Sequence, residues 1–81
     1  MSNFRKQIWD TVRRVFDLGM DYKLEDLQYR ITPGWDSIAH MALVAELEDE
    51  FNIMIDTIDV IEMSDFNKIE EIIERYLSAK S

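Results

Sequence analysis

The feature that most constrains the fold of this chain is the position of its helix-breaking residues. Both glycines and the only proline fall within residues 19–34, and the stretches before and after contain neither. Glycine and proline disfavour the interior of a helix, so a stretch without them is free to form a long one. The chain therefore divides into a helix-forming segment, a long irregular connection and a second helix-forming region.

The first and last segments have the apolar spacing of amphipathic helices. In residues 3–18, apolar side chains recur at i, i+4, i+8, i+11 and i+12, so they form one stripe. Asn3 is a suitable N-cap for this helix, and Gly19 is well placed to end it. Residues 65–79 show a similar stripe, with Ser64 as the candidate N-cap. Each stripe predicts a helix with one face on a shared core.

Two further helices are expected between these segments. Residues 37–51 have a helical pattern, and residues 57–62 fit one short helix. No segment of strand length alternates apolar and polar residues, so we expect no sheet. We predict an all-α fold, a small four-helix bundle with three longer helices and a short third helix, in a single domain over residues 1–81. The connection over residues 19–36 is long for a bundle. Three of its apolar residues are expected to pin it across the helix ends: Leu24, Leu27 and Ile31.

Composition excludes several kinds of site. The chain has no cysteine, which leaves neither disulfides nor thiolate metal ligands. Charges are scattered through the first residues without the apolar core of a signal peptide. The longest uninterrupted apolar run, residues 41–45, is far too short to span a bilayer. We therefore expect a cytoplasmic protein, a monomer, without membrane insertion.

The net charge of −8 is unevenly distributed along the chain. Residues 1–36 contain six acidic and six basic residues, whereas residues 37–81 contain eleven acidic and three basic ones. Such an acidic surface repels nucleic acid and anionic membranes and attracts basic protein surfaces. Acidity by itself is better explained by a surface that only keeps a small protein in solution.

The predicted helix over residues 37–51 has apolar residues on two opposite sides of its helical wheel. In a bundle, the side with the larger residues is buried and the other side stays exposed. A small exposed apolar strip with an acidic rim is typical of a docking surface for a basic partner with an apolar centre. Alternatively, the long connection covers part of this strip, Ile38 and Met41 in particular. The core side consists of Leu43, Val44, Leu47 and Phe51; the second side, called the outer strip below, consists of Ile38, Met41, Ala42 and Ala45, with Glu46, Glu48 and Asp49 around it.

Ser37 stands at the start of this helix. Gly34 allows a tight turn into it, and Asp36 is a good N-cap because its carboxylate can accept backbone N–H groups. The Ser37 hydroxyl is then left at the first turn, pointing outward. The positive end of the helix dipole favours a phosphate placed there.

At these residues the sequence resembles the acyl carrier protein family, which includes the related peptidyl and D-alanyl carriers. The signature of that family is Asp-Ser followed by Leu or Ile, and here it reads Asp36-Ser37-Ile38. The helix continues as LVAELEDEF over residues 43–51, similar to the leucine-rich and acid-rich second helix of the family. Length, acidity, the long first loop and the short third helix also agree, so the resemblance covers nearly the whole chain.

The resemblance implies that Ser37 is the attachment site of 4′-phosphopantetheine, taken from coenzyme A and joined by a separate phosphopantetheinyl transferase. The terminal thiol of this arm would carry an acyl or aminoacyl group as a thioester. Asp36 would be the flanking motif residue, and the protein would not itself be an enzyme. Partners would be the transferase, a loading enzyme and downstream synthases or transferases with basic docking surfaces. The residues expected to contact them are Asp36, Ile38, Met41, Ala45, Glu48 and Asp49.

Some positions depart from the carriers of fatty acid synthesis. Those carriers commonly have a further acid where this chain has Ala42, and Trp35 and His40 are also unusual for them. The sequence Gly-Trp-Asp-Ser is closer to free-standing carriers of specialised pathways, which load amino acids, hydroxy acids or polyketide units. Fatty acid, polyketide, nonribosomal peptide and cell-surface pathways stay open.

Three other functions are alternatives to a carrier. A hydrolase could use Ser37, His40 and Asp36, but the sequence offers no oxyanion hole or substrate pocket, and His40 is expected at the margin of the core. A cation could bind a run of acids, although the ligand order of an EF-hand is missing, and a solvated acidic face is expected instead. The remaining alternative is an acidic helical interaction module without a prosthetic group. The acids considered as cation ligands are Asp56, Asp59, Glu62 and Asp65.

Overall fold

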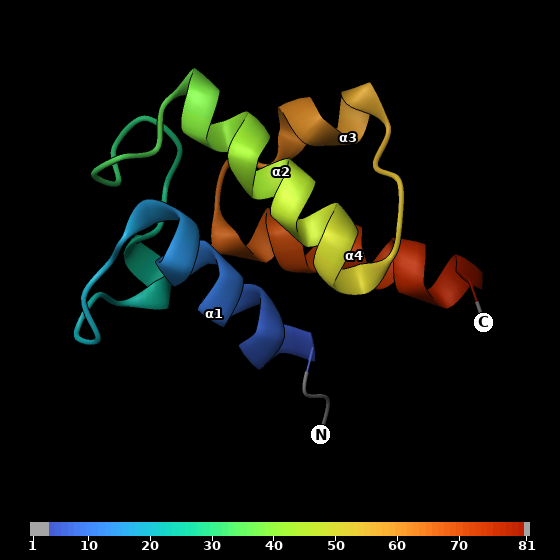
Figure 1. Cartoon of the computed structure of the whole chain (residues 1–81), viewed down its shortest axis with the longest axis horizontal. Helices are drawn as coiled ribbons and strands as arrows, with labels where there is room; N and C mark the ends of the chain where they lie inside the picture. The colour runs from blue at the N-terminus through green and yellow to red at the C-terminus, as the bar shows by residue number, and fades with distance from the viewer. Residues whose placement is uncertain (1–3, 81) are drawn as a thin grey trace.

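The computed structural model describes residues 4–80, and their fold is all-helical. Four α-helices follow one another along the chain, the third of them short, so the predicted fold class is confirmed (Figure 1). Within the described residues no strand forms, and one isolated β-bridge joins Gln28 to Asp65. The elements are α1 (Phe4–Phe16), the 3₁₀ helix η1 (Leu24–Asp26), α2 (Ser37–Phe51), α3 (Thr57–Glu62) and α4 (Phe66–Lys80).

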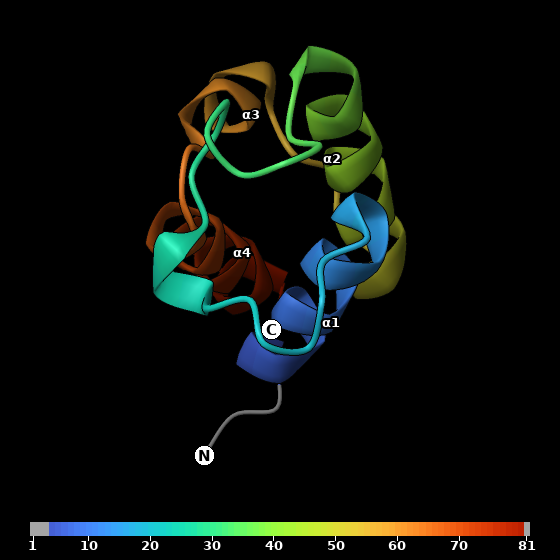
Figure 2. The same ribbon diagram turned by 90° about the vertical axis from the view of Figure 1, so that its left-hand side faces the viewer.

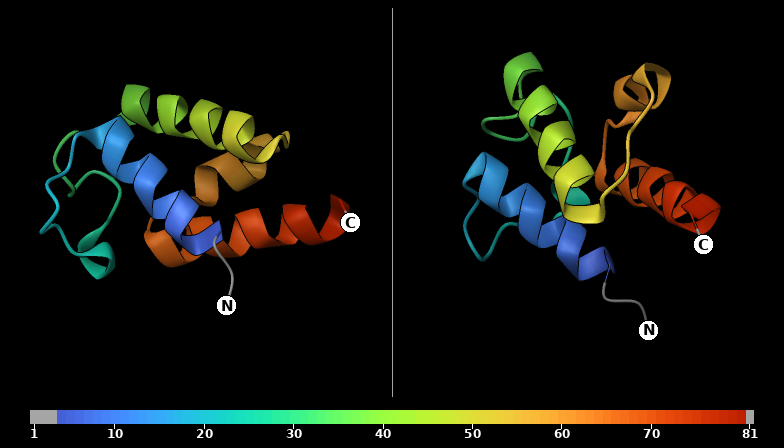
Figure 3. Two further views of the ribbon diagram at one scale, coloured as in Figure 1. Left: turned by 60° about the horizontal axis from the view of Figure 1, so that its bottom comes forward. Right: turned by 45° about the vertical axis from the view of Figure 1, so that its right-hand side comes forward.

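The helices surround one core, and the long connection crosses one end of it. Helix α1 packs most extensively on α2 and also contacts α4. Viewed end-on, α1 and α2 lie on one side and α3 and α4 on the other, with the connection running across the end nearest the viewer (Figure 2). The turned views show α1 beside α2, and α3 above α4 (Figure 3). The start of α2 therefore lies beside the connection.

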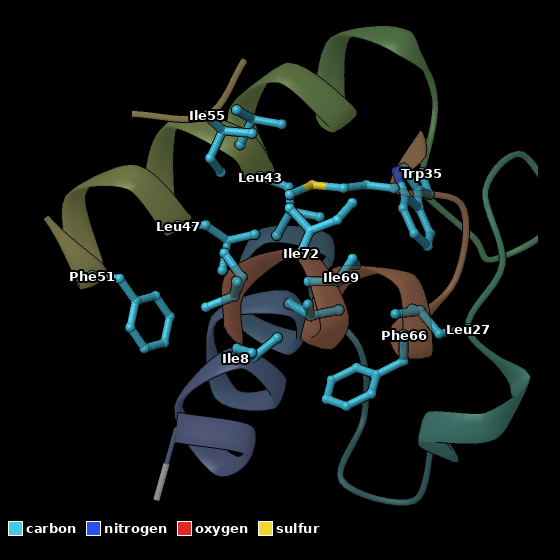
Figure 4. Close-up of a cluster of buried hydrophobic side chains, with 14 of the residues drawn as sticks. Ile8, Leu27, Trp35, Leu43, Leu47, Phe51, Ile55, Phe66, Ile69 and Ile72 are labelled. Atoms are coloured by element: carbon cyan, nitrogen blue, oxygen red, sulfur yellow. The ribbon is translucent and has the colours of Figure 1, made fainter. Parts of the chain in front are cut away.

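The core is built from the apolar stripes of three helices (Figure 4). As predicted, the core side of α2 is buried, and α1 and α4 bury their stripes against it. The connection adds Leu27 and Trp35, each only 2% exposed. Helix α3 contributes no buried residue. Among the described residues, those that are 0% exposed are Ile8, Val12, Leu43, Leu47, Ile69 and Ile73.

The ends of α1 and α4 differ from the sequence prediction. Helix α1 ends at Phe16, and Asp17, rather than Gly19, takes the left-handed conformation that follows the helix, with φ 55°. The Leu18 N–H donates to Arg13 O at 3.0 Å, which closes the last turn. Aspartate tolerates this conformation better than most residues. The predicted end at Gly19 is therefore wrong, and the predicted cap at Asn3 lies outside the described residues.

Helix α4 is capped by Asp65, so the prediction of Ser64 is also wrong. The Asp65 Oδ1 accepts the Lys68 N–H at 2.8 Å. The Ser64 carbonyl accepts the Tyr29 N–H at 2.8 Å and so holds the connection instead. The two neighbouring residues therefore have different roles at this junction. The Asp65 carboxylate caps the helix, and the Ser64 carbonyl binds the connection.

The connection is pinned by different residues than expected. Leu27 is buried and Leu24 partly buried, as predicted, but Ile31 is 68% exposed. The chain turns tightly at this point, with Arg30 at φ 71°, and the apolar site beside the core is filled by Trp35, whose ring stacks on Phe16 at 5.1 Å. Ile31 is therefore a surface residue.

Helix α3 is held largely by polar contacts with its neighbours. Arg75 Nη2 donates to Asp59 Oδ1 at 2.9 Å, and Tyr76 Oη donates to Asp59 Oδ2 at 2.6 Å. These hydrogen bonds, the one from Arg75 first, hold the pKa of the Asp59 carboxyl below its ordinary value. On the other side, the Val60 carbonyl accepts a hydrogen bond from α2, described below. A helix with few buried apolar contacts opens at lower free energy than a core helix.

Candidate functional site

Ser37 is the first residue of α2, and its side chain is exposed. Asp36 has extended backbone angles, and its Oδ1 accepts the Ala39 N–H at 2.9 Å, so the predicted N-cap is confirmed. Gly34 has φ 85°, a backbone conformation that residues with a side chain rarely adopt. The chain turns at Gly34 and enters the helix. The cap occupies the Asp36 carboxylate and leaves the Ser37 hydroxyl at the positive end of the helix.

A hollow opens beside Ser37 between α2 and α3. Its volume is about 300 Å³, and it is formed by residues of the connection, of both helices and of the segment after α3. Most of the wall is apolar, and the sequence did not predict it. This hollow is called the Ser37 cavity below. Its lining residues are Tyr29, Ser37, His40, Met41, Val60, Ile61 and Met63.

His40 links the connection, α2 and α3 through its two ring nitrogens. The Trp35 Nε1–H donates to His40 Nδ1 at 2.9 Å, so Nδ1 is the unprotonated nitrogen. Nε2 therefore carries the proton and donates to the Val60 carbonyl at 2.7 Å. His40 is only 9% exposed, as expected for the margin of the core. With both nitrogens engaged, the ring has no lone pair left to take a proton from Ser37.

Tyr29 approaches Ser37 from the connection. Its Oη lies 3.3 Å from Ser37 Oγ, and its ring contacts the rings of His40 and Trp35 at centroid distances of 5.2 and 5.8 Å. No sequence pattern predicts a role for Tyr29. The sequence shows a tyrosine in the connection. The position of its side chain depends on the path of the connection, which apolar periodicity does not predict.

The outer strip of α2 is exposed. Ile38 is 83% and Met41 57% exposed, and Ala42 and Ala45 are exposed as well. The long connection therefore does not cover this side, and the prediction of an exposed second apolar side is confirmed. On α3, Ile58 and Ile61 are 72% and 74% exposed, and Ile61 shares the Ser37 cavity with Met41.

The acidic rim of this strip is less uniform than its sequence suggests. Glu46 forms an ion pair with Arg14 of α1 at 3.2 Å. Glu48 is half-buried, and its Oε2 accepts the Ile55 N–H at 2.9 Å, which holds the segment between α2 and α3. Asp49 is exposed, and within the described residues no hydrogen bond or ion pair engages its carboxylate. Asp49 is therefore the rim acid whose charge is most available to a partner.

Two of the four acids considered as cation ligands, Asp59 and Asp65, have other contacts. Asp59 is bound to Arg75 and Tyr76, and Asp65 caps α4. Across residues 4–80, no group of three or more potential ligands is arranged to hold a metal ion. In the same part of the chain, no helix has the length and apolar character needed to cross a membrane.

Comparisons of this chain with models of known protein families, with curated proteins and with solved structures find no match. Its function is therefore inferred from the geometry around Ser37 and from the resemblance of Asp36-Ser37-Ile38, with the helix that follows, to carrier proteins.

Proposed function

We propose that this chain is a carrier protein that holds an acyl or aminoacyl intermediate on a 4′-phosphopantetheine arm attached to Ser37. It acts in the cytoplasm as a monomer and presents the cargo to partner enzymes. One observation carries the proposal: Ser37 is an exposed serine at the first position of α2, directly beside an exposed apolar strip on the same helix. The modification site and a surface for the modifying enzyme are thus adjacent.

The residues around Ser37 fit the phosphodiester of such an arm. The hydroxyl is exposed, and Asp36 is turned to the Ala39 N–H, as its cap requires. The N-terminus of a fifteen-residue helix favours negative charge through its dipole and its free N–H groups. The Ser37 cavity offers space beside the attachment point.

Attachment requires Ser37 Oγ to act as a nucleophile in the active site of the transferase. Oγ forms a bond to the phosphorus that bears the pantetheine of coenzyme A, the phosphoanhydride bond breaks, and 3′,5′-ADP leaves. The Ser37 proton must go to a base of the transferase, because both His40 nitrogens are engaged by Trp35 and Val60. The attached arm supplies a terminal thiol that holds the cargo as a thioester.

Docking would use the outer strip and the acidic side of α2. Ile38, Met41 and Ala45 supply a small apolar contact, and Asp49 attracts basic groups of the partner. A small strip with peripheral charge gives fast encounter and weak binding. This combination suits a carrier that visits several enzymes, each of which meets the tethered cargo at high effective concentration.

Two other functions would use some of the same features. An interaction module without a prosthetic group would also expose an apolar strip within an acidic surface, so only the modification separates it from a carrier. A hydrolase based on Ser37 and His40 would need a free imidazole nitrogen facing the serine. Neither nitrogen of His40 is free, since Trp35 engages one and Val60 the other, which favours the carrier over the hydrolase.

The test is the intact mass of the purified protein after incubation with coenzyme A and a broad-specificity phosphopantetheinyl transferase. We expect a mass increment equal to phosphopantetheine, located on the peptide that contains Ser37. A known carrier protein treated in parallel shows that each transferase is active. If transferases of several types modify that control but leave this chain unchanged, the carrier function is wrong and the interaction module is favoured.

A further inference from the structure

We infer that Tyr29 is a positioning residue for the group on Ser37, and that its hydroxyl donates a hydrogen bond to the phosphodiester. This inference rests on the proposed function, since it concerns the same attachment site. It goes beyond the attachment itself because it assigns a residue of the connection, eight positions before Ser37, to the orientation of the arm.

The first reason is the distance between the two hydroxyl groups. Tyr29 Oη and Ser37 Oγ are 3.3 Å apart, which is longer than a normal O–H···O hydrogen bond. In the unmodified protein the contact is therefore weak. The non-bridging phosphate oxygens of a modified serine lie two bonds beyond Oγ, so rotation about the Cβ–Oγ bond can bring one of them closer to Tyr29 than Oγ itself.

The second reason is that the Tyr29 side chain is held in place. Its backbone N–H donates to Ser64 O at 2.8 Å, which ties this part of the connection to the junction before α4. Its ring lies edge-on to Trp35, with 77° between the planes, and tilted against His40. His40 is itself fixed by Trp35 and Val60. A donor fixed in this way loses little conformational freedom when it binds.

The third reason is the lack of another side-chain donor on the cavity wall. Among the residues that line the Ser37 cavity, the polar side chains are Tyr29, Ser37 and His40. His40 already donates its Nε2 proton to Val60, and Ser37 loses its proton when it is modified. The Tyr29 hydroxyl is then the remaining donor, and a hydrogen bond to a charged phosphodiester is stronger than one between neutral groups.

The consequence is a preferred direction for the first bonds of the arm. A phosphodiester held by Tyr29 points toward the Ser37 cavity, between α2 and α3, rather than rotating freely about Cβ–Oγ. The arm would then leave the surface at one end of the outer strip, where Met41 and Ile61 border the same cavity.

The experiment compares three modified proteins, namely wild type, Tyr29→Phe and Tyr22→Phe. Tyr22 is the matched control, since it is another tyrosine of the connection, with a hydroxyl that bonds Thr32 at 2.9 Å. Three-bond couplings between phosphorus and the two Ser37 β-protons, measured by NMR, report rotation about the Cβ–Oγ bond. The ³¹P chemical shift reports the hydrogen bond. A short modified peptide containing Ser37 supplies the values for free rotation.

In wild type we expect unequal couplings, which means one dominant rotamer, and a ³¹P shift different from that of the peptide. Tyr29→Phe should lower the population ratio of this rotamer about tenfold or more, as expected for the loss of one hydrogen bond to a charged group. Tyr22→Phe should leave couplings and shift as in wild type, and thermal unfolding checks that all three proteins fold.

Two results overturn the inference while the carrier function stands. One is a Tyr29→Phe protein with the couplings and shift of wild type. The other, which needs no variant, is a wild-type protein with the couplings of the peptide. If wild type accepts no arm under conditions that modify a known carrier, the proposed function fails and this inference fails with it.

Discussion

Helix α2 has apolar side chains on two sides, and their surroundings are opposite. On the core side, Leu43 and Leu47 are 0% exposed and belong to one buried cluster with residues of α1 and α4. On the outer side, Ile38 and Met41 are 83% and 57% exposed, although the same helix carries them. Burial of the core side stabilises the fold, which explains why its residues are apolar. The outer side is exposed, so burial in the core does not account for its apolar residues.

The polar residues of α2 differ between its sides as well. His40, toward α3, has both ring nitrogens bonded within the protein, and Glu48 holds the backbone of Ile55. Asp49 is exposed without such a bond in the described part of the chain. Two acids that are adjacent in the sequence therefore differ in role, because Glu48 binds the backbone whereas Asp49 faces solvent.

The largest effect is expected on the core side. Leu47→Ala should lower the free energy of unfolding by about 2–5 kcal/mol, because it leaves a cavity among fully buried neighbours. Ala42→Ser, on the outer strip, should change it by less than about 0.5 kcal/mol, as for most surface substitutions. Urea unfolding of both variants checks this. Similar destabilisation by the two substitutions would mean that α2 does not have one buried and one exposed side.

A smaller effect is expected from the rim charges. Asp49→Lys combined with Glu48→Gln removes negative charge beside the outer strip, and the glutamine oxygen can still accept the Ile55 N–H. We expect modification of this variant by the transferase to be about tenfold slower at low salt, through a lower association rate. The difference should shrink as salt screens the charges. Modification rates measured over a salt series provide the test.

The control for this variant makes the same change of net charge on another helix. Glu71→Lys with Glu74→Gln alters two exposed acids of α4. Glu70 is avoided because it is bonded to Arg5. The α4 variant should be modified at nearly the wild-type rate. If both variants slow modification equally, overall charge alone matters and α2 has no special docking side.

The smallest effect is expected from the apolar part of the strip. Met41→Ala removes exposed apolar surface, so it should weaken docking to the transferase about fivefold without changing stability. Unlike the charge variant, this effect should persist at high salt, because no charge is lost. A loss that disappears as salt rises would show that the apolar contact contributes little and that the outer strip is not the docking surface.

Much of the fold could be predicted from the sequence because it depends on local periodicity. The bounds of α2 and α3 agree with the predicted 37–51 and 57–62, and the core side of α2 is buried. The apolar spacing within one helix determines which side faces the core, and Asp36 caps by reaching only three residues ahead.

The missed features depend on contacts between distant parts of the chain. The bond from His40 to Val60 and the approach of Tyr29 to Ser37 both require knowledge of where the connection and α3 lie. Ile31 was expected to be buried on apolar character alone, but the tight turn beside it leaves that place to Trp35. The two helix ends were predicted wrongly for a different reason. At each end a nearby aspartate, Asp17 or Asp65, was as able to end or cap the helix as the predicted Gly19 or Ser64.

The central claim is that Ser37 carries the arm, and its most direct test is transferase labelling of Ser37→Ala beside Ser64→Ala. Ser37→Ala should fold like wild type, because the side chain is exposed and Asp36 supplies the cap. Ser64 is also exposed but lies before α4. We predict that Ser64→Ala gains the full mass of phosphopantetheine and that Ser37→Ala gains none. A Ser37→Ala protein that still accepts the group would contradict the account.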